Sequence, residues 1–152
     1  MENKLRKSIV VTGASSGIGN IPIQFDIAKS EAFEKTINDI ILKAKDNTMY
    51  GLVNNAGYVE AGAVEDITMN DLRNQFETNF FGLVGFTKKV LPIMMNDNRN
   101  RGRALEGRIV NISSLAGLMS LPLIGAYSAT KYALEAISDA LRIELWNTNI
   151  KS

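Results

Sequence analysis

The stretch SIVVTGASSGIG, residues 8–19, decides the fold because it joins an apolar strand directly to a glycine-rich turn. Residues 8–12 form the short apolar run that is typical of a buried strand. Gly13, Gly17 and Gly19 follow at once, where a dinucleotide-binding turn would lie, and glycine there lets the backbone approach a pyrophosphate closely. Ordinary turns also contain glycine triplets. The interpretation therefore depends on residues further along the chain.

A second group of polar residues lies between positions 114 and 131. Tyr127 follows Ser114 by 13 positions and precedes Lys131 by four. A helix that begins near Ala126 would place Tyr127 and Lys131 on one face, because residues four apart are neighbours there. The Lys131 ammonium would then lower the pKa of Tyr127 toward the pH at which a general acid or base works best. The pattern predicts proton exchange at an alcohol or carbonyl oxygen that Ser114 also contacts, with hydride carried by a nicotinamide.

Elsewhere, apolar strands alternate with helical patterns. Strands are expected at 21–25, 50–53 and 107–113, and helices at about 30–45, from Thr68 to a bend or end near Pro92, and at 126–146. Thr68 with Asp71 has the pattern of a helix N-cap. The alternation predicts an α/β fold with a three-layer, doubly wound parallel sheet (Rossmann-like), whose ligand lies beyond the carboxyl ends of the strands. Gly13, Asn55 and Ser114 fall at those ends.

Composition narrows the functions that remain. A chain of 152 residues, 45% hydrophobic and 22% charged, can bury the core of one domain. Its net charge of +1 predicts no nucleic-acid partner. Without cysteine or histidine the chain has no disulfide, no zinc–thiolate site and no Ser/His hydrolase pair, and we expect no metal. No apolar run is long enough for a membrane span, and residues 1–7 do not form a signal peptide, so we predict a cytoplasmic protein.

Taken together, these motifs resemble the short-chain dehydrogenase/reductase family, in its single-domain branch. Asn54-Asn55-Ala56-Gly57 resembles the family's NNAG motif, which stabilises the sheet at the end of its fourth strand. Asn79 matches the helix asparagine that completes the family's tetrad of asparagine, serine, tyrosine and lysine. Within the branch, residues 118–122 and 127–145 look like those of hydroxysteroid and retinol dehydrogenases.

The resemblance implies an NAD(P)-dependent dehydrogenase or carbonyl reductase. Tyr127 would exchange the proton, and Lys131 would lower its pKa and bind the nicotinamide ribose. Ser114 would orient the substrate oxygen, and Asn79 would hold a water in a proton relay. The substrate would be a small alcohol or carbonyl compound, hydrophobic ones included.

The family's cofactor contacts map onto two turns, a strand end and the helix expected at 126–146. The implied contacts are Gly13, Ser15, Ser16, Gly17, Ile18, Gly19, Asp26, Ile27, Asn55, Ala56, Gly57, Tyr127 and Lys131. Resemblance to reductases favours NADP over NAD. Position 16 is serine, however, where a basic residue often accommodates the 2′-phosphate of NADP, so the choice stays open.

Each proposed site residue also has a structural interpretation. Asn79 could be a buried polar residue that stabilises a distorted turn. Tyr127 could be an amphipathic core residue, and Asp26 a cap at a strand end. Ser113 competes with Ser114, which is preferred because the family's serine lies 13 residues before its tyrosine.

The chain is short for this family. Only about eight residues separate Thr12 from the strand expected at 21–25, whereas parallel neighbours need a crossover of about a dozen or more. We infer that a unit of roughly 30 residues is missing near Gly19 and Asn20, and that the family's C-terminal strands would follow Ser152. Two hypotheses remain: a longer enzyme with omitted segments, which is favoured, or a shortened, catalytically inactive binding or scaffold module.

The resemblance also implies an assembly. In the family, the helices around 70–95 and 126–146 pack against a second subunit, so we expect a homodimer or homotetramer. The candidate interface residues are Leu83, Phe86, Ala136 and Leu145, with ordinary core packing as the alternative.

Overall fold

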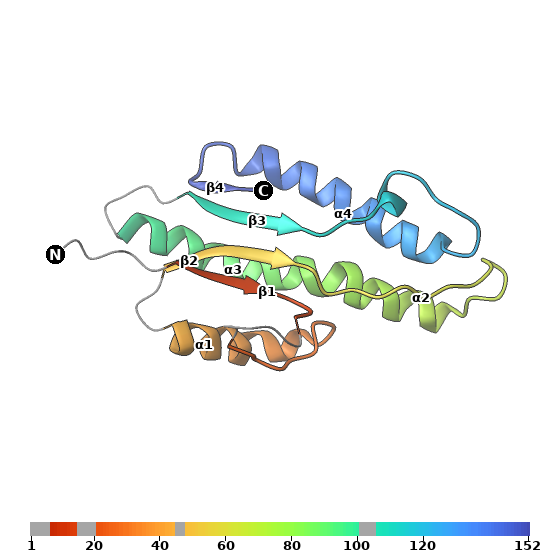
Figure 1. Ribbon diagram of the computed structural model, residues 1–152, viewed down its shortest axis with the longest axis horizontal. Helices are drawn as coiled ribbons and strands as arrows, with labels where there is room; N and C mark the ends of the chain where they lie inside the picture. The colour runs from red at the N-terminus through yellow and green to blue at the C-terminus, as the bar shows by residue number, and fades with distance from the viewer. Residues whose placement is uncertain (1–6, 15–20, 45–47, 101–105) are drawn as a thin grey trace.

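The computed structural model describes residues 7–14, 21–44, 48–100 and 106–152. Four parallel strands form one sheet in the order β1, β2, β3, β4 (Figure 1), with the ranges Lys7–Val11, Thr48–Asn54, Gly107–Asn111 and Ile150–Lys151. Leu52 in β2 is in register with Val10 of β1 and with Ile109 of β3. The parallel α/β sheet predicted from the sequence is confirmed.

Helical connections join these strands, as parallel pairing requires. The connection from β1 to β2 contains the 3-10 turn η1, Ser30–Ala32, and α1, Phe33–Ala44. From β2 to β3 the chain forms α2, Met69–Phe76, the π-helical turn η2, Glu77–Gly82, and α3, Leu83–Asn100. From β3 to β4 it forms the 3-10 turn η3, Leu115–Gly117, and α4, Gly125–Glu144. Within the described ranges, none of these helices has the length and apolar character to cross a membrane.

The long helical segment begins as predicted but ends later. Thr68 caps α2, because its hydroxyl oxygen accepts a hydrogen bond from the Asp71 backbone N–H at 3.1 Å. Pro92 was expected to bend or end the helix, yet α3 continues past it to Asn100. The helix predicted over 126–146 is confirmed as α4.

The strand predicted at residues 21–25 is wrong. This segment is irregular, and Pro22 could not donate to a strand ladder. Phe25 instead packs against the core. Its ring centroid lies 6.4 Å from that of Phe33 and 5.2 Å from that of Phe86. The short crossover inferred from this strand therefore does not exist, because the strand that follows β1 is β2 and α1 lies between them.

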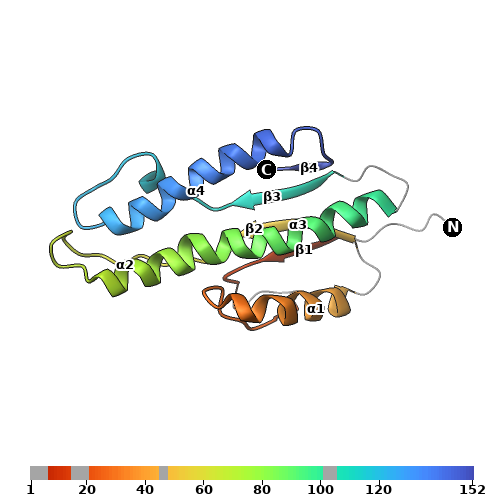
Figure 2. The same ribbon diagram turned by 180° about the vertical axis from the view of Figure 1, so that it is seen from behind.

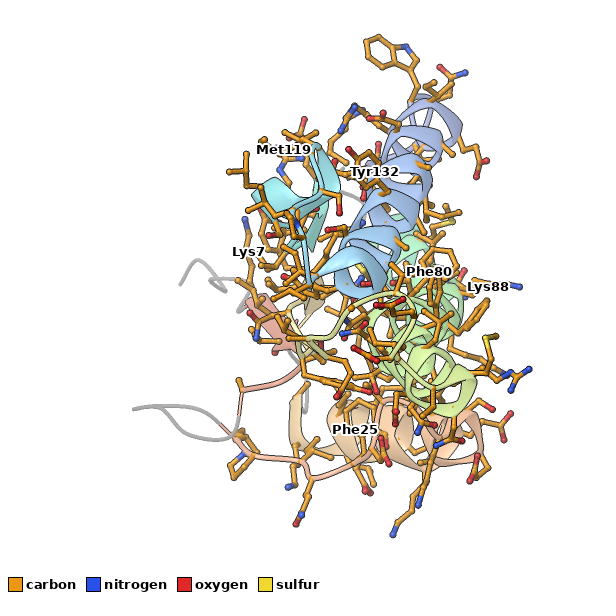
Figure 3. The ribbon with its side chains drawn as sticks, turned by 90° about the vertical axis from the view of Figure 1, so that its right-hand side faces the viewer. Lys7, Phe25, Phe80, Lys88, Met119 and Tyr132 are labelled. Atoms are coloured by element: carbon orange, nitrogen blue, oxygen red, sulfur yellow. The ribbon has the colours of Figure 1, made fainter. Side chains whose placement is uncertain are left out.

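The described helices cover one face of the sheet. Figure 2 shows α3 and α4 in front of the strands, and Figure 3 shows from the side that these helices and the strands form two layers. Ile9, Val11 and Val110 point to the opposite face and are exposed. The described residues thus form two of the three predicted layers. The chain break predicted near Gly19 and Asn20 lies outside the described residues.

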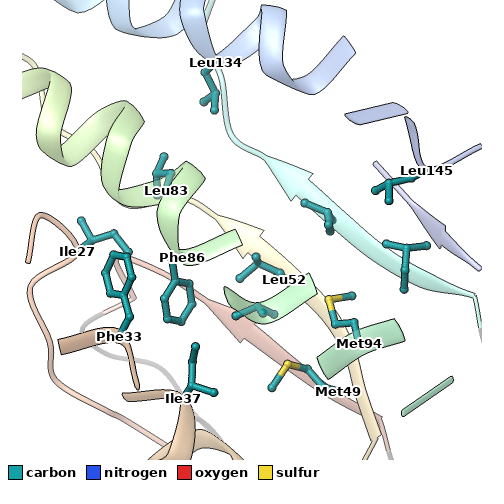
Figure 4. Close-up of a cluster of buried hydrophobic side chains, with 13 residues drawn as sticks. Ile27, Phe33, Ile37, Met49, Leu52, Leu83, Phe86, Met94, Leu134 and Leu145 are labelled. Atoms are coloured by element: carbon teal, nitrogen blue, oxygen red, sulfur yellow. The ribbon is translucent and has the colours of Figure 1, made fainter. Parts of the chain in front are cut away.

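The core lies between the sheet and the helices (Figure 4). Leu52 and Ile109 contribute from the strands, and Leu83 and Phe86 from α3. Leu83, Phe86 and Leu145 were candidates for a subunit interface, but all three are buried within the chain. The alternative of ordinary core packing is confirmed for them, whereas Ala136 is exposed.

Candidate active site

The turns that follow β1 and β2 are joined at the carboxyl ends of these strands. The Thr12 hydroxyl oxygen accepts hydrogen bonds from the backbone N–H groups of Asn55 and Ala56, both at 3.0 Å. The Asn55 side chain donates to the Thr12 carbonyl oxygen at 3.1 Å. Gly13 has a φ of +73°, and a Cβ there would lie 2.8 Å from the Ala56 Cα, so only glycine fits. Gly13 therefore lies beside Asn55 and Ala56, two of the predicted ligand residues of the turn after β2.

Other predicted cofactor contacts are placed differently. The Asp26 carboxylate accepts a hydrogen bond from the Ala28 backbone N–H at 3.0 Å, so it caps its own loop. Ile27 has its side chain in the core, and its carbonyl oxygen lies against Gly82. The predicted contacts outside the described residues are Ser15, Ser16, Gly17, Ile18 and Gly19.

Asn79 lies in the π-helical turn η2 and is fully buried, with 0% of its surface exposed. Its Oδ1 accepts from the Tyr58 backbone N–H at 2.9 Å, and its Nδ2 donates to the Tyr58 carbonyl oxygen at 2.8 Å. Nδ2 also donates to the Thr130 hydroxyl oxygen at 3.2 Å. The amide therefore joins the loop after β2 to α4. Turns of π-helix are frequent at functional sites.

Lys131 reaches from α4 back to the sheet. Its Nζ donates to the Ile112 carbonyl oxygen at 2.7 Å, and only 4% of the residue is exposed. The same Nζ lies 5.7 Å from the centroid of the Tyr127 ring, which confirms that the two residues share one helix face. Burial lowers the pKa of Lys131, and the nearby Glu135 carboxylate opposes this shift.

Ser114 and Ser113 follow β3 but differ in access. Ser114 is half-buried and caps η3, with its Oγ accepting from the Ala116 backbone N–H at 3.2 Å. Because its oxygen accepts this bond, its hydroxyl hydrogen can still be donated. The Ser113 Oγ is enclosed and has no hydrogen-bond partner among the described residues. A substrate oxygen could therefore reach Ser114 more readily than Ser113.

Sequence reasoning missed Thr130, which connects two of the site residues. Thr130 is fully buried, accepts from Asn79 and donates to the Tyr127 carbonyl oxygen at 2.7 Å. The bond to Tyr127 could have been anticipated from their spacing of three residues on one helix. The bond to Asn79 could not, because the two residues are 51 positions apart.

The arrangement combines a phenol, an ammonium and a hydroxyl beyond the carboxyl ends of the strands. Across the described ranges, no three acidic, histidine or cysteine side chains are placed to hold a metal ion. The available chemistry is a proton donor and acceptor, a positive charge and a glycine, Gly13, at the end of β1. Such a set suits proton transfer at an oxygen next to a bound dinucleotide.

Comparisons with known proteins give a consistent result. The family described as short chain dehydrogenase matches residues 20–152. The chain is 35% identical to the uncharacterized oxidoreductase YbbO of Escherichia coli (strain K12), over 97% of this chain and 63% of that protein. It is also 35% identical to the 3-ketodihydrosphingosine reductase of Bacteroides thetaiotaomicron, over 94% of this chain and 60% of that protein.

Solved structures agree with this family match. A short-chain dehydrogenase from Streptomyces avermitilis superposes with a TM-score of 0.73 at 37% identity, over 85% of this chain and 44% of that one. The structure of ElxO with NADP bound has a TM-score of 0.74 at 28% identity, over 85% of this chain and 49% of that one. The chain thus spans between 44% and 63% of the length of these proteins.

Proposed function

Because the chain belongs to the short-chain dehydrogenase family, we propose that it serves in an NAD(P)-dependent oxidoreductase that interconverts an alcohol and a carbonyl group. One observation carries the proposal: the buried Lys131 ammonium is held by the Ile112 carbonyl oxygen beside the Tyr127 ring. Burying a lysine is unfavourable unless its ammonium is hydrogen-bonded or paired, as it is here with Ile112. A positive charge at this point stabilises negative charge that develops on the phenol oxygen.

The described residues fit a dinucleotide. Gly13 is held against Ala56, where a Cβ has no space, and Gly13 is exposed, so its backbone can approach a pyrophosphate. A Cβ at Gly57 would lie 3.9 Å from the Lys131 Nζ, so the loop after β2 passes beside the ammonium. An ammonium has three N–H donors. One is used by Ile112, and we assign the others to ribose hydroxyls. When bound, the nicotinamide supplies or accepts the hydride.

The proton moves between Tyr127 and the substrate oxygen. During carbonyl reduction Tyr127 donates its hydroxyl proton to the oxygen while hydride reaches the carbon, and during alcohol oxidation both transfers reverse. The Ser114 hydroxyl donates a hydrogen bond to the same oxygen and orients it. Asn79 uses both hydrogens of Nδ2 to hold Tyr58 and Thr130, so the water of the proposed relay would use the remaining acceptor site of Oδ1.

The proposal extends to the cofactor and to the class of substrate. We propose NADP rather than NAD, supported by the resemblance to reductases and by the NADP-bound ElxO structure. Calorimetric titration should give tighter binding of NADPH than of NADH, and equal affinities would contradict this preference. The substrate proposal is a small, apolar alcohol or carbonyl compound of the kind that hydroxysteroid and retinol dehydrogenases use. Exposed Leu118, Met119 and Leu121 between Ser114 and α4 support it.

A second candidate is a catalytically inactive binding module made from an incomplete domain. The alignment with YbbO runs over 178 positions but includes 97% of a 152-residue chain, so about 30 positions have no residue of this chain opposite them. About 30 unmatched positions correspond to the unit of roughly 30 residues that is expected to be missing from the nucleotide-binding domain. The test is the intact mass of the protein purified from its natural source. A mass near 16.7 kDa would support the module, and a much larger mass would support the enzyme.

The chemistry is tested by Tyr127→Phe, which removes the hydroxyl and keeps the ring. Turnover of a carbonyl panel with NADPH should fall by about 10² to 10⁴, the usual contribution of general acid–base catalysis. Cofactor binding should change little. Wild-type turnover in the variant would show that Tyr127 is not the proton donor. Cofactor binding by the unmodified chain without any turnover on the panel would favour the binding module.

A further inference from the structure

The 3-10 turn η3 carries the Ser114 hydroxyl and is too short to be stable by itself. Ser114 is the N-cap of η3, and Leu118 is its C-cap. The turn contains three residues. A single helical turn is unfavourable in isolation, because it fixes several backbone dihedral angles for one hydrogen bond. The contacts that hold η3 therefore decide where the Ser114 hydroxyl lies.

Helix α4 holds η3 at two points. Gly117 packs closely against it, since a Cβ there would lie 3.1 Å from the Lys131 carbonyl oxygen. The Tyr132 hydroxyl donates to the Leu118 carbonyl oxygen at 2.6 Å, which is within the usual range for a bond between two oxygens. In Figure 3, Tyr132 lies on α4 close to Met119, which follows Leu118. The phenol therefore ties the far end of η3 to the helix.

We propose that Tyr132 is a positioning residue that holds the Ser114 hydroxyl in place for the proposed oxidoreductase reaction, on which this role rests. Ser114 and Tyr127 must meet the same substrate oxygen, yet they lie on different elements. The bond from Tyr132 joins these elements. Its hydroxyl hydrogen is used by Leu118, so Tyr132 acts through Ser114 rather than on the substrate.

Tyr132→Phe removes this bond and keeps the ring. Tyr132 and Leu118 are 46% and 70% exposed, so water can replace the lost partner and the fold should survive. The thermal midpoint should fall by no more than about 4 °C. A much larger fall would make Tyr132 a residue of the fold as a whole and would overturn the proposal.

The first test is amide hydrogen exchange of the 152-residue chain. The backbone N–H groups of Gly117 and Met119 make hydrogen bonds of this turn, at 2.9 and 3.1 Å. Both should exchange at least about tenfold faster in Tyr132→Phe, because the turn opens more often without its anchor. Tyr50→Phe, at a half-buried position of β2, is the matched control. Unchanged exchange in Tyr132→Phe, or an equal increase in Tyr50→Phe, would refute the anchor.

The second test is turnover of a carbonyl panel with NADPH. In Tyr132→Phe, kcat should fall by about tenfold, because small misplacements of catalytic groups have large effects. KM for NADPH should stay unchanged. In a Ser114→Ala background the same substitution should lower kcat by less than about twofold, because no hydroxyl is left to misplace. An equal fall in both backgrounds would show that Tyr132 does not act through Ser114.

The two measurements together separate this role from the proposed function. Turnover by the wild type that Tyr132→Phe leaves unchanged would refute the positioning role alone. Faster exchange in Tyr132→Phe without any turnover by the wild type would refute the oxidoreductase reaction, and the positioning role with it.

Discussion

At the scale of single residues, the site depends on a few buried polar side chains with long-range partners. Lys131 connects α4 to the end of β3, and Asn79 connects the loop after β2 to Thr130. Each replaces hydration with hydrogen bonds inside the chain, so removing one partner leaves the other unsatisfied. These residues therefore affect stability as well as chemistry.

The lowered pKa of Lys131 predicts a dependence of stability on pH. Between the folded pKa and the ordinary value of 10.5, the unfolded chain binds more protons than the folded one. The free energy of unfolding of the wild type should therefore rise with pH through this window. Lys131→Met lacks the group, so urea denaturation should show the wild type gaining stability relative to the variant as the pH rises toward 10.5. Lys35→Met, at an exposed position of α1, is the control. A constant difference for Lys131→Met would contradict the prediction.

Thr130 is predicted to be a positioning residue. Thr130→Val keeps the shape but removes the hydroxyl that accepts from Asn79 and donates to Tyr127. We expect a loss of about 1 to 3 kcal/mol in the free energy of unfolding. We also expect a fall in kcat of about tenfold, because small misplacements of catalytic groups have large effects, with KM for the cofactor little changed. Thr130→Ser should restore kcat, and failure of that rescue would refute the role of the hydroxyl.

At the scale of elements, the segment from Met69 to Asn100 is helical throughout but changes its geometry once. The π-helical turn η2, Glu77–Gly82, brings Asn79 to the loop after β2 and places Gly82 against the Ile27 carbonyl oxygen. A Cβ at Gly82 would also lie 2.9 Å from the Glu77 carbonyl oxygen. The close approach of two backbone segments therefore requires glycine here.

Gly82→Ala should destabilise the chain, because both crowded atoms belong to the backbone and cannot rotate away. We expect a loss of at least about 1 to 3 kcal/mol, the usual range for overpacking. Gly125→Ala is the control. A Cβ at Gly125 would make only ordinary contact with Val64 at 3.5 Å, and alanine has a higher helix propensity than glycine in the first turn of α4. Thermal unfolding of both variants measures the effect, and the midpoint should fall in Gly82→Ala but not in Gly125→Ala. Equal unfolding midpoints would contradict the close packing of η2 on Ile27.

At the scale of the whole molecule, the described residues leave apolar surface on the second face of the sheet. Purely parallel sheets are normally covered on both faces, and Ile9, Val11 and Val110 are exposed here. The family's assembly through its long helices stays a proposal. Its candidate surface on α4 contains Ala136 and Ile143, rather than the buried Leu83, Phe86 and Leu145.

The assembly is tested by a charged substitution on α4. Ile143 is 76% exposed, so Ile143→Glu should leave the fold intact but weaken self-association by at least about tenfold, since an unpaired charge would enter the interface. Leu42 on α1 is 73% exposed, and Leu42→Glu is the matched control outside the proposed surface. Sedimentation velocity over a range of concentrations measures both. Equal association of the two variants would contradict an interface on α4.

Local patterns in the sequence predicted β1, β2, β3, the main helices and the pairing of Tyr127 with Lys131. These predictions used apolar runs, a cap at Thr68 and a spacing of four residues. Such patterns depend only on neighbours along the chain, so they can be recognised before the fold is known. They missed β4, because the C-terminal strands were expected to follow Ser152, whereas Ile150–Lys151 already pairs with β3. The strand expected at 21–25 failed because Phe25 packs with Phe33 and Phe86, a contact that local pattern does not contain.

Partners that are distant along the chain became apparent only once the layers were packed. Lys131 meets Ile112 across 19 positions, and Asn54 meets Thr87 across 33. Packing also encloses the Ser113 hydroxyl more than that of Ser114, and it makes Asn79 a link to Thr130. The physical reason is that local conformation follows from each residue's neighbours, whereas burial and hydrogen-bond partners follow from how the sheet and helices meet.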